Sequence, residues 1–107
     1  MRYDVKLTPH AIVQIREAIE YISNVLLVPD IAASWADKLE NEISGLSEMP
    51  ERYPLFDREP WRSRGIRKMP VMNFLVYYFL DQDMKTVWVA AVVYGKRDQM
   101  NALREMP

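Results

Sequence analysis

The residues best suited to chemistry in this sequence are basic, and they are concentrated in its second half. One run of them precedes and enters a predicted strand: Arg58, Arg62, Arg64, Arg67 and Lys68. An arginine fork binds a phosphate through two parallel hydrogen bonds, and a lysine adds a point charge. The run therefore predicts an RNA-binding surface. The alternative is a solvated loop and an edge strand that its charges protect from aggregation.

Within this run Arg67 and Lys68 are the candidates for catalysis, and Arg62 and Arg64 are candidates for RNA contacts. Successive side chains of a strand point to opposite faces of the sheet. Arg67 and Lys68 are therefore predicted to lie on opposite faces, and at most one of them shares a face with a given third residue.

A second basic group follows the last predicted strand, in the segment Tyr94-Gly95-Lys96-Arg97-Asp98. The glycine lets the backbone turn and brings the charged side chains to the sheet edge. If Arg97 and Arg67 converge across neighbouring strands, they can hold a phosphodiester and neutralise the charge that grows on its oxygens. Tyr94 would orient the substrate or donate a proton, and Lys96 would contact RNA. The alternative is that Arg97 begins a helix and Tyr94 is an aromatic residue at the rim of the core.

Other residue types that could perform catalysis or bind metals are few. The chain has no cysteine and one histidine, His10, which is far in sequence from both basic groups and is interpreted as structural. The carboxylates of the basic half fall in a turn and a loop, so a two-metal nuclease, a metal site and a cofactor are not expected. Trp35 and Trp88 fit core positions, whereas Trp61 lies among basic residues and could stack on an RNA base.

Length and charge narrow the class of protein. A chain of 107 residues is enough for one core, so a single domain over residues 1–107 is expected. Residues 1–50 carry four basic and eight acidic side chains, whereas residues 51–107 carry ten basic and seven acidic ones. With a pI near 5.8 the protein is not a general polyanion binder, but a local anion site is compatible with this asymmetry. No apolar run approaches the roughly 20 residues of a membrane span, and the start lacks the apolar stretch of a signal peptide, so we expect a cytoplasmic protein without membrane association.

The first half predicts a strand followed by a helical hairpin. Residues 3–7 alternate between apolar and polar, and Thr8-Pro9 supplies an N-cap and a first-turn proline. A break is predicted at Pro29-Asp30, and a second helix over residues 31–47. Apolar residues recur at helical spacing in both helices: Ile12, Ile15, Ile19, Ile22 and Leu26, then Ala32, Trp35, Ala36, Leu39, Ile43 and Leu46.

The second half predicts an antiparallel meander after a proline-containing loop over residues 50–62. Strands are expected over residues 65–72, 74–80 and 86–94, and Pro70 favours an edge position for the first of them. A short helix is expected over residues 99–105. The order β-α-α-β-β-β-α is that of an α+β fold, with a helical hairpin packed on a small, mostly antiparallel sheet.

The meander strands are almost continuously apolar, which predicts that both faces of the sheet are covered. The hairpin covers only one of them. Either a partner segment fills an apolar groove on the remaining surface, or aromatic rings shield each other there.

The chain resembles the RelE/ParE superfamily of toxins from type II toxin–antitoxin systems over nearly its whole length. Four groups of residues carry the resemblance together with the element order: Ala32-Ala33-Ser34-Trp35 with Ile43-Ser44-Gly45-Leu46 and Met49-Pro50, Gly65-Ile66-Arg67-Lys68, Asn73-Phe74-Leu75-Val76-Tyr77-Tyr78, and Val92-Val93-Tyr94-Gly95-Lys96-Arg97-Asp98. The resemblance implies a RelE/ParE-like fold, a cognate antitoxin as partner and a toxin–antitoxin hetero-oligomer.

The RelE-type members of this superfamily cleave messenger RNA in the ribosomal A site without a metal. Carried over by motif, Arg67 and Lys68 match the basic strand positions of their catalytic cluster, and Arg97 matches the arginine after the last strand. Two positions depart from that pattern, because Phe74 replaces an arginine and Leu103 stands where a tyrosine is common. Our first hypothesis is a ribosome-dependent endoribonuclease that uses Arg67, Lys68, Arg97 and Tyr94.

Two alternatives stay open. The ParE-type members bind and poison DNA gyrase without acting as enzymes, and a long helical hairpin suits that activity. A degenerate toxin would serve only as an antitoxin-binding subunit, which the departures at Phe74 and Leu103 make plausible. In all three cases an antitoxin segment, extended or helical and rich in acidic residues, is expected to cross the apolar groove and the basic site.

Overall fold

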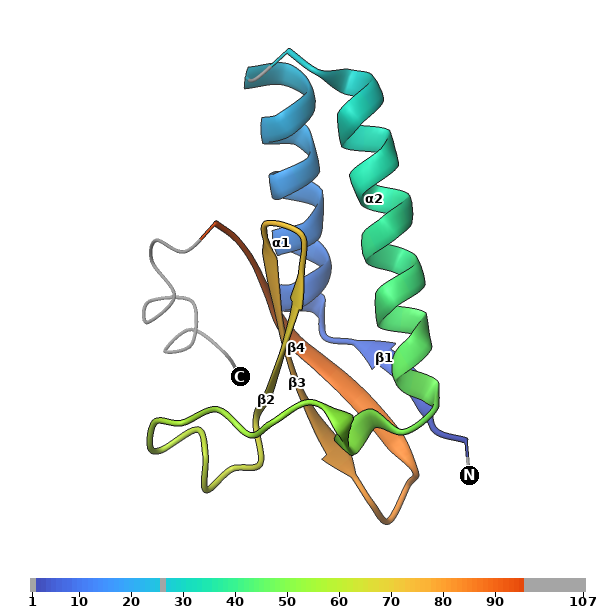
Figure 1. The fold of residues 1–107 in the computed structure, drawn as a ribbon, viewed down its shortest axis with the longest axis vertical. Coiled ribbons are helices and arrows are strands. Elements are labelled where there is room, and N and C mark those ends of the chain that lie inside the picture. Colours follow the sequence, from blue (N-terminus) through green and yellow to red (C-terminus); the bar gives the residue numbers. More distant parts are fainter. Residues whose placement is uncertain (1, 26, 96–107) are drawn as a thin grey trace.

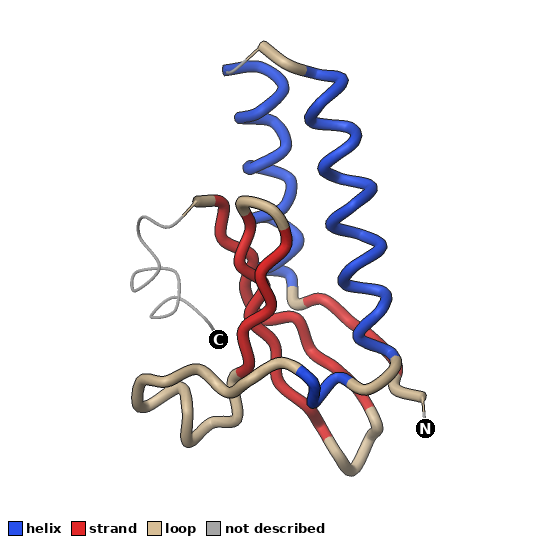
Figure 2. The backbone as a smooth tube through the Cα atoms, viewed as in Figure 1, coloured by secondary structure: helices blue, strands red, loops and turns tan. Residues whose placement is uncertain are grey.

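The fold is a helical hairpin on one face of a four-stranded sheet (Figures 1 and 2). The computed structural model describes residues 2–25 and 27–95. Its elements are β1 (Asp4–Leu7), α1 (Pro9–Glu20) with a π-helical turn (Tyr21–Val25), α2 (Pro29–Ser44), short 3₁₀ turns (Gly45–Ser47 and Pro50–Arg52), β2 (Arg67–Val71), β3 (Phe74–Asp81) and β4 (Thr86–Tyr94). The expected α+β fold is confirmed, and the helix expected over residues 99–105 lies outside the described residues.

Each helix of the hairpin begins at a proline, Pro9 in α1 and Pro29 in α2. Thr8 caps α1, because its side-chain oxygen accepts a hydrogen bond from the Ala11 amide at 3.2 Å. The break predicted at Pro29-Asp30 is corrected, because Pro29 is the first residue of α2. A missing N–H costs nothing at that position. The predicted stripe of α1 is also corrected at one position: Ile12 is 44% exposed, and Ala11 faces the core instead.

The sheet has the order β1-β4-β3-β2, with β1 parallel to β4 and the other pairs antiparallel. A β-bulge interrupts the pairing of β3 with β4, since Tyr77 is opposite Ala91 and Tyr78 is opposite Val89. One extra residue shifts the alternation of a strand by one position. Val89 before the bulge and Val92 after it therefore both pack in the core beneath the helices.

The two faces of the sheet carry separate cores. We call the face beneath the helices the hairpin face and the opposite one the loop face. The buried residues of the hairpin face come from both helices and from all three meander strands, and Tyr78 is among them. The loop face is covered by the segment between α2 and β2, which supplies Phe56, Trp61 and Ile66 and packs on Tyr77, Ala91 and Val93. The prediction that both faces are covered is thus confirmed, with a loop as the second cover.

Strand β2 is the edge strand that Pro70 predicts. The Lys68 amide donates to the Pro54 carbonyl at 3.3 Å, which shows that even-numbered positions of β2 direct their backbone away from β3. Pro70 occupies such a position, where its lack of an N–H leaves no donor unpaired. The same pairing leads the loop around the edge of the sheet, from the hairpin face to the loop face.

Candidate functional site

Arg67 lies at the start of β2 on the hairpin face, and its side chain fastens the loop. Its Nη1 donates to the carbonyls of Glu51 at 3.2 Å and Tyr53 at 2.6 Å. Its cross-strand partner Tyr78 donates its hydroxyl to the Pro50 carbonyl at 2.5 Å. Hydrogen bonds from a charged donor are stronger than neutral ones. Arg67 and Tyr78 together therefore bind three backbone carbonyls between residues 50 and 53, where the loop leaves the hairpin face.

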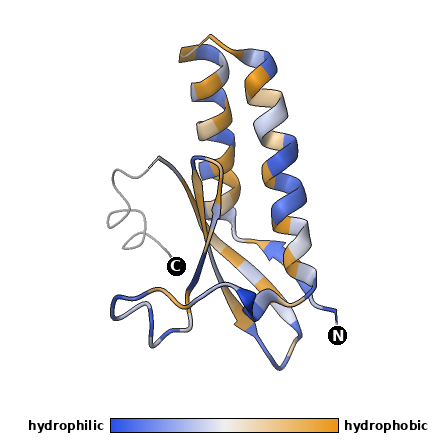
Figure 3. Cartoon of the chain, viewed as in Figure 1, coloured by the Kyte–Doolittle hydropathy of each residue, from blue (hydrophilic) through white to orange (hydrophobic). Residues whose placement is uncertain are grey.

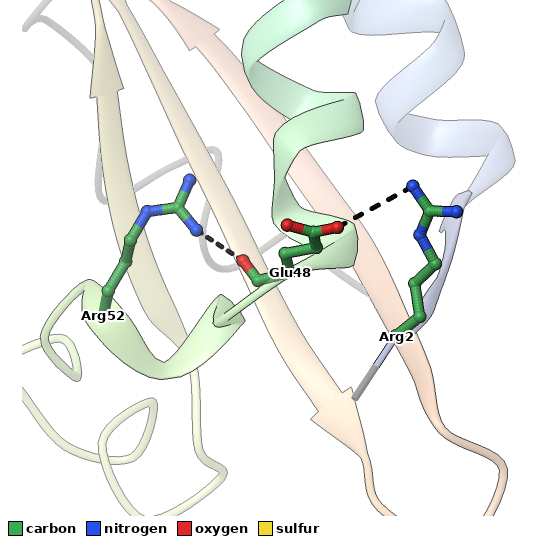
Figure 4. Close-up of polar contacts among 3 residues, drawn as sticks. All are labelled: Arg2, Glu48 and Arg52. Atoms are coloured by element: carbon green, nitrogen blue, oxygen red, sulfur yellow. Dashed lines mark hydrogen bonds and ion pairs between the residues drawn. The ribbon is translucent and has the colours of Figure 1, made fainter.

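A neighbouring arginine extends this anchorage toward α2. The Nη1 atom of Arg52 donates to the Glu48 carbonyl at 2.6 Å (Figure 4). It also donates to the Met49 carbonyl at 3.1 Å. The Glu48 carboxylate faces Arg2 at 3.8 Å in an exposed ion pair, which adds little to stability. Sequence reasoning did not single out Arg52, Tyr78 or these carbonyl contacts. A buried tyrosine hydroxyl usually has a hydrogen-bond partner, but this signal does not distinguish Tyr78 from Tyr77 in the same strand.

Lys68 lies on the loop face, so the prediction that it and Arg67 point to opposite faces is confirmed. It is opposite Tyr77 in the register of β2 and β3, and its Nζ lies 5.4 Å from the centre of the Phe56 ring. A cation over a ring is weakly stabilised by it. Burial raises the pKa of Tyr77 to about 12, and its hydroxyl has no hydrogen-bond partner within the described chain.

Tyr94 is not brought together with Arg67. It packs on the hairpin face against Phe74, Trp35 and Tyr21, with ring centres 5.3, 6.0 and 6.3 Å away. It is opposite Phe74, the first residue of β3, whereas Arg67 is opposite Tyr78, four residues further along that strand. Four residues of strand correspond to roughly 13 Å along the sheet. The two positions are therefore separated along the hairpin face by four residues of strand.

The loop arginines and Trp61 have opposite surroundings. Arg62 and Arg64 are exposed in the hydrophilic outer turns of the loop (Figure 3), where they remain candidates for contacts with a partner. Trp61 is only 6% exposed and packs against Phe56, with ring centres 5.9 Å apart. The prediction that Trp61 stacks on a base is therefore corrected: its ring is the centre of the loop-face core.

The turn that carries these arginines is closed by Glu59. The carboxylate of Glu59 accepts a hydrogen bond from the Ser63 amide at 2.9 Å. Hydrogen bonds from Ser63, with a smaller contribution from the charge of Arg62, lower the pKa of Glu59. The acidic side chain thus orders the turn in which Arg62 and Arg64 are exposed.

The second basic group lies largely beyond the described chain. Gly95 is the last residue that the structure describes. Its φ of +81° suits a glycine, and its amide donates to the Asn73 carbonyl at 2.7 Å. Lys96 and Arg97 lie outside the described residues. Their predicted roles remain predictions.

Two further findings bear on the class of site. Within residues 2–25 and 27–95 no three His, Cys, Asp or Glu side chains are placed to hold a metal ion. No helix of the described chain combines the length and hydropathy that a membrane span requires.

Comparison with known proteins identifies the family of this chain. The family model described as ParE toxin of the type II toxin–antitoxin system parDE matches residues 5–99. The chain belongs to this family. It is thus a type II toxin of the ParE/RelE superfamily, with the RelE/ParE-like fold expected from its sequence. No curated protein sequence matches it.

Solved structures of related toxins share the fold. The chromosomal ParDE system of P. aeruginosa matches with a TM-score of 0.71 and 14% identity, over 89% of this chain and 98% of the other. The toxin–antitoxin complex RelBE2 of Mycobacterium tuberculosis gives 0.61 and 22%, over 88% and 99%. A double arginine-to-alanine mutant of the E. coli toxin RelE in the free state gives 0.66 and 15%, over 99% and 95%. The likeness extends to both branches of the superfamily, so the fold alone does not choose between their activities.

Proposed function

We propose that this toxin arrests growth by binding a protein target, DNA gyrase, and not by cleaving messenger RNA. The observation that carries the proposal is the separation of Arg67, Lys68 and Tyr94, the three residues predicted to cut RNA that the structure describes. Arg67 and Lys68 lie on opposite faces, and the positions of Tyr94 and Arg67 are four residues of strand apart on the hairpin face. Cleavage by a 2′-hydroxyl needs a proton acceptor, a proton donor and a cation within contact distance of one phosphate.

The loop face gives the same indication. A sheet face that binds a phosphodiester has to present polar groups, because an apolar surface cannot replace the water around a charged phosphate. In this toxin Phe56, Trp61 and Tyr77 fill the middle of the loop face as a buried core. The family match to ParE toxins supports the same choice. Binding then relies on exposed surfaces, among which the hairpin and the arginine turn are candidates.

The proposal includes a cognate antitoxin as partner. Two of the structural neighbours, the ParDE system and RelBE2, are toxin–antitoxin pairs. A toxin lethal to its own cell has to be neutralised where it is made, so we place both proteins in the cytoplasm as a hetero-oligomer. The antitoxin is expected in the adjacent reading frame.

The deciding experiment is induction of the toxin alone in bacteria, with incorporation of labelled thymidine and labelled amino acids followed separately. DNA synthesis is expected to fall first, and the purified toxin should inhibit supercoiling of relaxed plasmid by gyrase. Two variants serve as matched controls: Lys68→Ala removes a cation, and Tyr94→Phe removes one hydroxyl from an aromatic cluster that it leaves packed. Both should stay toxic. An early loss of protein synthesis that either variant abolishes would establish the ribonuclease instead, and no arrest would indicate a degenerate subunit.

A further inference from the structure

The hairpin tip, which we define as residues 25 and 27–31, carries large apolar side chains in solvent. Both helices continue past the ends of the strands, so the tip projects from the body of the toxin (Figure 1). Val25 is 62% exposed, Leu27 77% and Ile31 46%, and Figure 3 shows the tip as a hydrophobic end. Exposed apolar side chains gathered at one place indicate a surface for a protein partner.

The hairpin is held together by other side chains. Ile22 is buried and Val28 packs against the core of the hairpin face, so the turn has its own core-facing residues. The exposed residues surround an open hollow of about 290 Å³ instead. It is lined by Leu27, Val28, Pro29, Asp30 and Ile31. An apolar side chain of a partner can enter this hollow while Leu27 enters a pocket of the partner.

The backbone at Leu27 supports a role outside the fold. Its φ of +56° lies in the left-handed region, where a Cβ atom is costly and glycine is not. A leucine there is unfavourable for the backbone, and its exposed side chain adds little to the core. A strained residue that the fold does not require indicates a functional contact. Met49 and Met72 share the left-handed backbone, but neither has another exposed large apolar residue within four positions in the described chain.

The charges around the tip specify its partner. Residues 17–37 contain no lysine or arginine and four acidic side chains, all exposed: Glu17, Glu20, Asp30 and Asp37. The complementary surface is an apolar pocket bordered by lysine and arginine. A protein that holds DNA presents these residues to the phosphates. Gyrase acts on DNA, so it offers such a border beside its DNA path.

We propose that the hairpin tip is the part of this toxin that docks on DNA gyrase, with Leu27 in an apolar pocket bordered by basic residues. The inference rests on the proposed function, because it names the surface that contacts that target. The turn with Arg62 and Arg64 is the other exposed candidate, and it lies far from the tip (Figure 1). Its arginines would repel a basic border, so the charges favour the tip.

A second copy of the toxin fits the tip less well. Two tips placed face to face would bring acidic side chains together without a basic partner, which is unfavourable across an interface. A tip that packs on the arginine turn of another copy predicts a toxin that associates with itself. Sedimentation of the purified protein detects that association.

The first test removes the Leu27 side chain without harming the fold. Leu27→Gly deletes the apolar side chain and relieves the left-handed backbone, so the variant should melt close to the wild-type temperature. Its Kd for purified gyrase should rise at least about tenfold. Met49→Gly makes a similar exchange at a position that is 74% exposed and has a φ of +48°. That control should change the Kd by less than about twofold.

A second pair of variants repeats the test within the helices. Ile31→Gln places a polar side chain at the tip, on α2, and glutamine is a good helix former. Ile12→Gln makes the same change in α1 at a residue of nearly equal exposure, 44% against 46%. Ile31→Gln should raise the Kd for gyrase about tenfold, and Ile12→Gln should leave it within about twofold.

The acidic border is tested by salt. Removing two charges with Glu20→Gln and Asp30→Asn together should weaken binding at low salt and make the Kd less sensitive to salt between about 50 and 500 mM. Asp83→Asn removes an exposed charge from the turn between β3 and β4 and should leave the salt dependence unchanged. An equal salt dependence in the double variant and the wild type would overturn the basic border.

The outcomes separate this inference from the proposed function. Full affinity for gyrase in both Leu27→Gly and Ile31→Gln would overturn the tip and leave gyrase as the target. A wild-type toxin that does not bind gyrase would overturn both proposals. A wild-type dimer that Leu27→Gly converts to a monomer would show that a second copy covers the tip, and would also overturn this inference.

Discussion

The two faces of the sheet are built in different ways. The hairpin face is covered by two amphipathic helices, and its core includes Leu39, Ile43, Met69 and Phe74. The loop face is covered by an irregular segment whose buried anchors are Phe56, Trp61 and Ile66. A helix satisfies its own backbone, whereas an irregular segment needs partners from elsewhere. Arg67 and Tyr78 provide these partners from the hairpin face, so the second cover depends on polar contacts made on the first.

The largest loss of stability is expected when the buried Trp61 ring of the loop face is removed. Trp61→Ala should lower the free energy of unfolding by about 3–5 kcal/mol, because a large buried aromatic is replaced by a cavity. Arg62→Ala, at the adjacent exposed position, should change it by less than about 0.5 kcal/mol. Urea denaturation measures both. A small loss in Trp61→Ala would mean that the loop contributes little to the fold and can open independently.

The next effect is expected at high pH and involves both faces. Burial raises the pKa of Tyr77 and of Tyr78 to about 12, and for Tyr78 the charges of Arg67 and Arg52 offset part of it. The folded protein then keeps protons that the unfolded chain releases above its ordinary tyrosine pKa of about 10. The contribution of these two tyrosines to the free energy of unfolding should be constant below pH 10. It should fall as the pH rises from 10 toward 12.

Denaturation midpoints measured across that range check the sign. Tyr77→Phe and Tyr78→Phe each remove one titrating group, so each should reduce the fall. If one variant abolished it entirely, only that face would exclude water from its tyrosine.

A smaller loss of stability is expected when the hydrogen bonds between Arg67 and the loop are removed. Arg67→Ala removes the hydrogen bonds to the Glu51 and Tyr53 carbonyls and should cost about 1–3 kcal/mol. Lys68→Ala removes only a cation over the Phe56 ring and should cost less than about 1 kcal/mol. Denaturation and growth arrest are measured together. A toxin that loses all activity in a fully stable Arg67→Ala variant would show that Arg67 contacts the target.

What the sequence predicts follows the same division. The strands at residues 74–80 and 86–94 follow from runs of apolar, β-prone residues, and the apolar face of α2 follows from its helical spacing. Pro70 indicates the edge strand. All of these signals are local in the chain. The contacts of Arg67 with Glu51 and Tyr53, and the burial of Trp61, depend on how the loop wraps around β2. Nothing local distinguishes an arginine that binds backbone from one that binds RNA.

The smallest and most discriminating change removes single hydroxyl groups from neighbouring positions of β3. Tyr78→Phe leaves the buried Pro50 carbonyl without its donor and should cost about 1 kcal/mol. Tyr77→Phe removes a buried hydroxyl that has no partner in the described chain, so it should be neutral or stabilise by less than about 1 kcal/mol. Urea denaturation at neutral pH compares the two. An equal loss in Tyr77→Phe would show that this hydroxyl has a hydrogen-bond partner in the folded protein, and that the loop face, like the hairpin face, depends on a polar contact.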